Sequence, residues 1–147
     1  MEIYTDCSFL EKERIAGLGV HIIDGQKQKS YSNWIKAPSN HYGELFAIYE
    51  ACILSGGVEC TIYTDSQTAL DFIHNNIKRK SRGDFKSENH YYAYQMMRVL
   101  AYRVRRVSPN IKFEKVKAHR RDYRIGHINN SIADLLAKKG ISKYMGR

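Results

Sequence analysis

The sequence predicts an α/β fold, and three observations support that prediction. Alternating apolar and polar runs typical of strands occur at residues 2–7 and 15–23 and again later in the chain. Helical periodicity separates these runs, most clearly over residues 42–54. Two strand-like runs also end alike, in IYTDCS at residues 3–8 and in IYTDSQ at residues 62–67. The shared ending suggests neighbouring strands that deliver carboxylates to the same place.

The predicted elements follow one another as three strands, a helix, a strand, two helices, a strand and a last helix. Asp24-Gly25 joins the second and third strands and is a strong pattern for a two-residue hairpin turn. The expected ranges, in chain order, are strands at 2–7, 15–23 and on towards Trp34, a helix at 42–54, a strand at 58–65, helices at 66–77 and 89–107, a strand at 111–119 and a helix at 129–139.

Glycines and small polar residues mark where these elements meet or end. Gly17 and Gly19 inside a strand indicate a close backbone approach or a bulge. Ser39 or Asn40 is the expected cap of the first helix, and Gly140 is expected to close the last one. Polar, basic connections are expected at 78–88 and 120–126.

Length and cysteine content place broad limits on the protein. A chain of 147 residues is expected to form one domain with a proper hydrophobic core. No apolar run approaches the ~20 residues of a membrane helix, so we expect no membrane partner. Strand-like sequence begins at once, and we expect no signal or transit peptide before it. The three cysteines lack C-x-x-C spacing, which favours reduced thiols and a cytoplasmic location over a disulfide framework or a zinc site.

Charge is divided unevenly along the chain. Residues 1–77 carry a net charge of −5, whereas residues 78–124 carry +11 and the tail adds +3. The basic half is densest in KRKSR at 78–82 and RVRR at 103–106. An acidic half beside a basic half suggests a cation site next to a surface that binds nucleic acid. The alternative is a solvated basic face without a partner.

Four carboxylates are candidates for that cation site. Asp6 and Asp65 follow the two similar strands, and parallel neighbours would place both at one edge of the sheet. Glu44 lies in the first turn of the first helix, and Asp134 lies between apolar residues of the last helix. Four acids brought together would repel one another, and hard divalent cations such as Mg²⁺ relieve that repulsion. Two such ions roughly 3.5–4 Å apart form a clamp that cleaves phosphodiesters.

Each acid also has a simpler explanation. Asp6 alone reads as a strand-end aspartate, Asp65 as a helix N-cap, and Glu44 as an acid favoured by the helix dipole. Asp134 is the hardest to explain in this way, because a charge among apolar neighbours needs a partner.

The motifs that carry these acids resemble ribonuclease H of type 1, as a prokaryotic or phage-like stand-alone catalytic domain, over essentially the whole chain. A strand ending in Thr-Asp-Gly-Ser is matched by YTDCS, and an acid in an Asn-x-x-x-Glu-Leu context is matched by NHYGEL. Thr-Asp-Ser-Gln is present unchanged, and VKAH with GHINNSIADLLAKKG matches the family's last motif. Each motif alone is weak, whereas four in the right order are strong evidence.

The resemblance implies a ribonuclease H-like fold with a mixed five-stranded sheet, its first three strands antiparallel, flanked by helices. It implies hydrolysis of the RNA strand of an RNA–DNA hybrid by a two-metal-ion mechanism, with Mg²⁺ as cofactor and Mn²⁺ as a substitute. Asp6, Glu44, Asp65 and Asp134 take the positions of the metal-binding catalytic carboxylates. His119 takes the position of the histidine that helps to protonate the leaving group or to release product, with His127 as the alternative. A monomer is expected.

Contacts to the hybrid are also implied by position. The 2′-hydroxyl, which distinguishes RNA from DNA, would be read around Cys7, Asn40 and Gln67, while Ser39 would contact a phosphate of the DNA strand. Ser39 and Asn40 have the alternative role of helix caps. The expected electrostatic contacts are Lys78, Arg79, Lys80, Arg82, Arg120 and Arg121.

The sequence departs from the family pattern at four places. Cys7 stands where the family usually has glycine, and the following loop, SFLEKERIAG, lacks the usual Gly-Pro-rich composition. The stretch RRDYR lengthens the gap between His119 and Asp134. The segment 78–88 lacks the tryptophans of the family's substrate-gripping handle, so charge is expected to replace their stacking.

Three other functions fit parts of the same pattern. Resolvase-type and other polynucleotidyl transferases share the carboxylate arrangement, but 147 residues leave no room for a transposase's additional DNA-binding modules. A retroelement ribonuclease H domain is a second alternative, and Met1 close to the first strand favours an independent gene product instead. A catalytically silent hybrid-binding module is the third, and the presence of all four acids argues against it.

Overall fold

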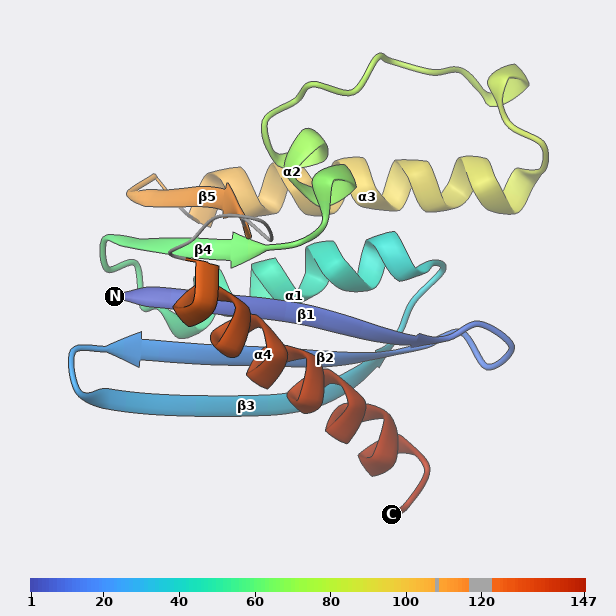
Figure 1. The fold of residues 1–147 in the computed structure, drawn as a ribbon. Coiled ribbons are helices and arrows are strands. Elements are labelled where there is room, and N and C mark those ends of the chain that lie inside the picture. Colours follow the sequence, from blue (N-terminus) through green and yellow to red (C-terminus); the bar gives the residue numbers. More distant parts are fainter. Residues whose placement is uncertain (108, 117–122) are drawn as a thin grey trace.

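The computed structural model describes residues 1–107, 109–116 and 123–147, with side chains in the last range described from residue 128 onward. One five-stranded sheet has the order β3-β2-β1-β4-β5 (Figure 1). β1 pairs with β2 and β2 with β3 in antiparallel fashion, whereas β4 pairs in parallel with both β1 and β5. The predicted mixed sheet is therefore confirmed. The strands are β1 (Glu2–Leu10), β2 (Ile15–Asp24), β3 (Lys27–Lys36), β4 (Cys60–Thr64) and β5 (Ile111–Lys115).

Helices cover both faces of this sheet. α1 and α3 lie on one face, and α4 crosses the other face diagonally (Figure 1). The segment between α2 and α3 arches over α3 and includes the short 3-10 helix η1, and we call residues 74–87 the arch. The helices are α1 (Asn40–Leu54), α2 (Gln67–Ile73), η1 (Arg82–Asp84), α3 (Glu88–Val107) and α4 (Tyr123–Tyr144).

The main core lies between the sheet and α1. Side chains alternate across a strand, so Ile3 of β1, Val20 of β2 and Ile62 of β4 all point to this face. They meet Leu45 and Ile48 of α1, and each of the five side chains has no exposed surface. Full burial of an aliphatic side chain contributes about 1.5–3 kcal/mol, so this contact fixes α1 firmly against β1 and β4.

On the other face, α4 lies directly on the backbone of the hairpin. A Cβ atom at Gly17 would overlap the carbonyl oxygen of Ala137, and one at Gly19 would overlap that of Ala133. The close backbone approach predicted for Gly17 and Gly19 is therefore confirmed. Ser32 of β3 ties the helix down further, because its hydroxyl donates to the carbonyl oxygen of Leu136 over 2.6 Å. These contacts fix the part of α4 that carries Asp134.

The last helix does not end where the sequence predicts. It passes through Gly140 and continues to Tyr144, because Gly140 sits against the carbonyl group of Asn33, where no side chain would fit. Its start also differs, since the backbone is helical from Tyr123 rather than from Asn129. Glycine is used here for close packing and not as a helix stop.

Two further boundaries differ because of contacts with other elements. β1 runs to Leu10 instead of ending at residue 7, because it stays paired with β2 as far as Ile15. α2 ends at Ile73, four residues early, and Asn75 just beyond it has a positive φ of 57°. The Arg105 guanidinium of α3 donates to the carbonyl oxygens at the end of α2, over 2.9 and 3.2 Å, and so satisfies groups that a longer helix would have paired.

All three cysteines are buried, and none forms a disulfide. Across the described parts of the chain, no helix has both the length and the apolar character needed to cross a membrane.

Candidate active site

Strand register brings two acidic residues together. β1 and β4 pair in parallel from Glu2 and Thr61 as far as Tyr4 and Tyr63, whose rings stack at 4.8 Å. Carried two residues further, the same register places Asp6 opposite Asp65. The chain turns away from the sheet after Thr64, so both carboxylates lie where the strands separate. The shared IYTD ending is therefore explained by the pairing of these two strands.

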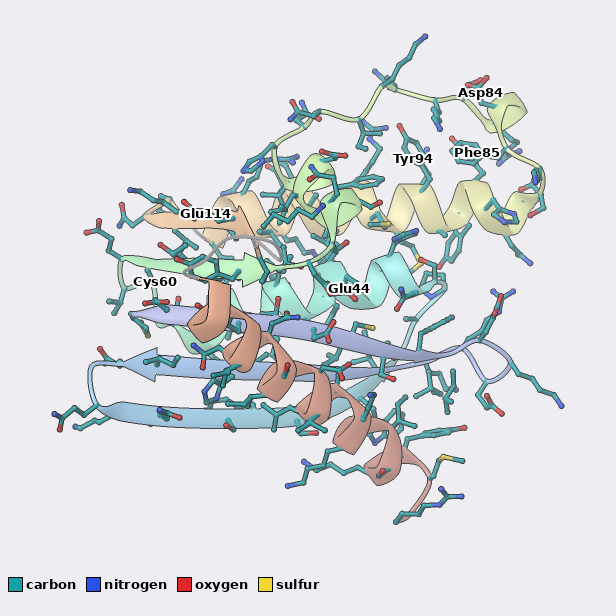
Figure 2. The ribbon with its side chains drawn as sticks, viewed as in Figure 1. Glu44, Cys60, Asp84, Phe85, Tyr94 and Glu114 are labelled. Atoms are coloured by element: carbon teal, nitrogen blue, oxygen red, sulfur yellow. The ribbon has the colours of Figure 1, made fainter. Side chains whose placement is uncertain are left out.

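α1 adds a third carboxylate, that of Glu44. Ser39 caps this helix by accepting a hydrogen bond from the Tyr42 N–H over 3.1 Å, which confirms the expected cap. One turn later Glu44 is 6% exposed and lies on the side of α1 that meets the sheet (Figure 2). Its Oε2 atom is buried and accepts no hydrogen bond in the described structure. An orphaned carboxylate oxygen at this depth is costly unless a cation or a proton supplies a partner.

Asp6, Glu44 and Asp65 form one carboxylate cluster. One ligand oxygen from each lies within 4.8 Å of the other two. Asp6 is 6% exposed and accepts the N–H of Cys7 over 2.9 Å, whereas Asp65 is exposed. Asp65 is not the N-cap of α2, because Ser66 takes that role by accepting the Ala69 N–H. The simpler explanation of Asp65 as a helix cap is therefore wrong.

Burial and mutual repulsion raise the pKa values of all three acids. Burial, together with the nearby Asp65 carboxylate, raises the pKa of Asp6 to about 7, against the opposing hydrogen bond from the Cys7 N–H. Burial, followed by Asp6 and Asp65, holds the pKa of Glu44 well above its usual range. Burial likewise raises the pKa of Asp65, while the charge of Lys115 lowers it. The cluster is therefore short of positive charge.

The fourth acid approaches from α4 but is partly engaged elsewhere. Asp134 lies close enough for its charge to raise the pKa values of Asp6 and Glu44. Its Oδ2 atom, however, lies 3.0 Å from Nζ of Lys138, one turn along the same helix, and it is not part of the 4.8 Å cluster. Sequence reasoning overlooked Lys138, although Asp-Lys spacing of four residues on a helix is a recognisable pattern for an ion pair.

The donor set fits a hard divalent cation. Every ligand in the cluster is a carboxylate oxygen, which is the type that Mg²⁺ and Mn²⁺ prefer. The orphaned Oε2 of Glu44 and the raised pKa of Asp6 both indicate that the described residues leave negative charge unpaired here. A bound cation would give the Glu44 oxygen a partner and would balance the negative charge around Asp6.

A cleft of about 710 Å³ opens between the start of α1 and the arch. Ser39 and Asn40 line it from α1, and Lys80 lines it from the arch. Gln67, which was also predicted to contact the hybrid, lies outside this lining and donates to Asp71 over 2.8 Å on the exposed side of α2. The cleft therefore unites three of the residues that the sequence proposes as contacts.

The basic residues of the arch are held by aromatic rings. The ammonium group of Lys80 lies 5.7 Å from the Phe85 ring centre, and the guanidinium of Arg82 lies 5.4 Å from that of Tyr91. Phe85 in turn contacts Tyr94 at 5.1 Å, as Figure 2 shows beneath the arch. Lys78 and Arg79 are exposed. Phe85, Tyr91 and Tyr94 supply aromatic support in a segment that lacks the family's tryptophans, and the sequence prediction of charge alone did not include it.

Comparison with known proteins identifies the family of the chain. Residues 1–142 match the RNase H family. The chain belongs to this family. No curated protein gives a significant match.

Solved ribonucleases H share the fold at low sequence identity. LC11-RNase H1, isolated from compost by a metagenomic approach, is 21% identical, with 98% of this chain and 96% of that chain covered and a TM-score of 0.69. The same protein in complex with an RNA/DNA hybrid gives 20% identity, 98% coverage of each chain and a TM-score of 0.68. RNase H1 from the archaeon Halobacterium salinarum NRC-1 is 15% identical, with 97% of each chain covered and a TM-score of 0.62.

Cys7, the departure from the family's usual glycine, lies on the face of the sheet that α1 covers. Its side chain is 9% exposed and packs with Ala16 and Ala47 beneath α1. Gly43 of α1 provides the space, since a Cβ atom there would overlap the Cys7 sulfur. Burial raises the pKa of the Cys7 thiol. In this ribonuclease H the cysteine fills a core position, and its thiol also lies close enough to Glu44 and Asp6 for their charges to raise its pKa.

Several candidates lie outside the described residues. His119, Arg120 and Arg121 belong to this group. His127 lies in the first turns of α4, but its side chain is not among those described. The choice between His119 and His127 therefore stays a prediction.

Proposed function

We infer that this ribonuclease H hydrolyses the RNA strand of RNA–DNA hybrids by internal cleavage. The observation that carries the inference is the cluster of Asp6, Glu44 and Asp65, whose ligand atoms lie within 4.8 Å of one another without an ion pair to any described cation. Membership of the RNase H family supports it. The hybrid bound to LC11-RNase H1 supports the choice of substrate.

We propose that two Mg²⁺ ions, with Mn²⁺ as a substitute, are the cofactors. Asp6, Glu44 and Asp65 would hold them, joined by Asp134 once it leaves Lys138. Bound divalent ions activate a water molecule and stabilise the leaving oxygen of a phosphodiester. The chain itself orients the carboxylates through the Cys7 N–H and through the rigid contact of α1 with the sheet.

The cleft and the arch would position the hybrid over the carboxylates. Asn40, Gln67 and the backbone at Cys7 are proposed to read the 2′-hydroxyl, and Ser39 to contact a DNA phosphate in addition to capping α1. The phosphate groups of the hybrid would be contacted by the positive charges of the arch, namely Lys78, Arg79, Lys80 and Arg82. His119 is proposed to assist departure of the leaving group, with His127 as the alternative.

The molecule that acts is proposed to be a single-domain monomer in the cytoplasm. One sheet with helices on both faces supports a single domain. Three buried cysteines without a disulfide support a reducing compartment.

The decisive experiment measures cleavage of hybrids with a labelled RNA strand. Wild-type protein should cut the RNA internally in Mg²⁺ or Mn²⁺, lose activity in EDTA and spare a DNA duplex. Asp6→Asn should abolish turnover and keep the fold. Asp24→Asn, an exposed aspartate at the β2–β3 turn, is the matched control and should retain wild-type activity. Equal cutting of the DNA duplex would favour a resolvase-type nuclease, and hybrid binding without any cutting would favour a silent binding module.

A further inference from the structure

A second hollow, of about 630 Å³, lies on the outer side of α3. It is bounded by the end of α2, the start of the arch and the exposed face of α3. Arg79, Arg98 and Arg105 enter it from these elements, and we call it the arginine groove. Among the described residues, no aspartate or glutamate lines it. Three guanidinium groups without an acidic neighbour in the lining make a strongly positive concave surface.

These arginines are positioned by the protein but not neutralised by it. Arg105 donates to the carbonyl oxygens of Phe72 and Ile73, which fixes its direction and leaves its charge uncompensated. The guanidinium of Arg98 lies 5.8 Å from the centre of the Tyr94 ring. The ion pairs found among the described residues involve neither of them. The groove is therefore suited to an anion.

Apolar and amide groups line the same hollow. Val99 is 55% exposed and Tyr102 is 52% exposed, which are high values for such side chains in the middle of a helix. The guanidinium of Arg106 lies 5.7 Å from the centre of the Tyr102 ring. Asn75 adds an amide group that can pair with a base edge, and Gln95, whose amide nitrogen donates to the Tyr91 hydroxyl, adds its carbonyl oxygen. Cations along a groove, with an exposed ring such as Tyr102 for stacking, are features that bind single-stranded nucleic acid.

The arginine groove adjoins the proposed substrate cleft. Phe72, Ile77 and Tyr94 line both hollows and so form a shared wall between them. A strand that leaves the cleft across the arch would reach the groove directly. We propose that the arginine groove binds single-stranded nucleic acid that extends from a duplex held in the cleft. The link to a duplex rests on the proposed function, whereas binding of a single strand does not.

Binding is tested first, without cleavage. Fluorescence anisotropy of a labelled 12-nucleotide oligo(dT) is measured with full-length Asp6→Asn protein in EDTA. Adding Arg98→Ala should weaken binding about fivefold and reduce the log–log salt slope by about 0.7, the value for one phosphate contact on a single strand. Tyr102→Ala should weaken binding about tenfold through lost stacking. Arg147→Ala removes one exposed guanidinium at the far end of α4 and should leave binding unchanged.

Cleavage then separates the two proposals. In the active protein, Arg98→Ala should leave KM for a blunt hybrid within twofold and raise it severalfold for a hybrid with a ten-nucleotide single-stranded extension. An equal effect on both substrates, or equal oligo(dT) affinity in Arg98→Ala and Arg147→Ala, would overturn the groove proposal. So would an oligoglutamate peptide that displaces oligo(dT) at equal charge concentration, because it would indicate a site for acidic peptides. Absence of hybrid cleavage would overturn the proposed function alone.

Discussion

At the scale of single residues, the site is defined by carboxylates that the protein does not neutralise. Asp6 and Glu44 are each 6% exposed, and the only described cation that affects the pKa of Asp65 is Lys115. Charges at such depth are usually paired. The protein therefore holds its negative groups in an unfavourable state until a cation arrives, which has consequences for stability that can be measured.

The first prediction concerns pH. The pKa of Asp6 is 3.8 in its ordinary state and about 7 in the folded protein. Between these values the folded protein binds a proton that the unfolded chain does not, so stability is lost as pH rises from about 4 to about 7. In EDTA, Tm should fall over this range, and Mg²⁺ should reduce the fall. Asp6→Asn should give a flatter curve, and superimposable curves for the two proteins would contradict the assignment.

The second prediction concerns the ion pair between Asp134 and Lys138. Since both side chains are about half exposed, the pair is weak and should compete only modestly with a metal ion. Lys138→Ala should lower the Mg²⁺ concentration for half-maximal activity about twofold to fivefold. The midpoint of Mg²⁺-dependent thermal stabilisation should shift by the same factor. Lys139→Ala, its exposed neighbour, should change neither value. If the two variants behave alike, Lys138 does not restrain Asp134.

At the scale of elements, the order of strands and helices could be predicted from the sequence, but their ends could not. Alternation and helical periodicity locate an element, and both are local properties. Gly140 reads as a helix stop because that is its usual role, yet it lies inside α4 because a carbonyl of β3 lies against it. The length of β1 likewise depends on its pairing with β2. Tertiary contacts decide these ends, and a single local window does not contain them.

In the candidate site, too, the features carried by local motifs could be predicted, whereas those that depend on tertiary contacts could not. Asp6, Glu44 and Asp65 were predicted from motifs and lie together, because the motifs occur at strand ends and on the helix that the core fixes. Lys138 and the aromatic support around Phe85 were not predicted. Their roles depend on which way a helix face turns and on how the arch closes over α3.

The third prediction tests how α4 is held on the sheet. Gly19→Ala would place a Cβ atom against the Ala133 carbonyl oxygen, next to Asp134. The helix must shift, so the free energy of unfolding should fall by about 1–3 kcal/mol or more. kcat should fall as well, because Asp134 moves with the helix. Gly83→Ala in the arch has open space around its Cβ position and should be nearly neutral. Denaturant unfolding and hybrid cleavage measure both effects.

At the scale of the whole molecule, the acidic and the basic groups lie in different parts of the structure. The acidic cluster lies where β1 and β4 diverge. The exposed basic residues belong to the arch, which passes over α3 (Figure 1). Arg82 is paired with Glu88, so the cations of the arch outside the described ion pairs are Lys78, Arg79, Lys80 and Lys86, three of them consecutive. A duplex that reaches from the arch to the acidic cluster would meet cations at one end and carboxylates at the other.

The fourth prediction follows from this separation. Replacing Lys78, Arg79 and Lys80 by alanine should raise KM for the hybrid and leave kcat nearly unchanged. Each lost phosphate contact should reduce the log–log salt slope by about 0.9 on a duplex of B-like charge density. A control with Lys27, Lys29 and Arg147 replaced removes the same charge from the edge strand β3 and from the C-terminus. Parallel lines for both triple variants in a KCl titration would show that the arch does not contact the hybrid.

The contact between Cys7 and Gly43 makes two distant positions in the sequence dependent on each other. Their side chains compete for one space, so a chain can carry bulk on the strand or on the helix but not on both. Substitutions here should show strong epistasis: Gly43→Ala should be much less damaging in a Cys7→Gly background, with residual cost from Ala16, whose Cβ would lie 2.8 Å away. Related sequences should accordingly gain a side chain at position 7 only after losing one at position 43.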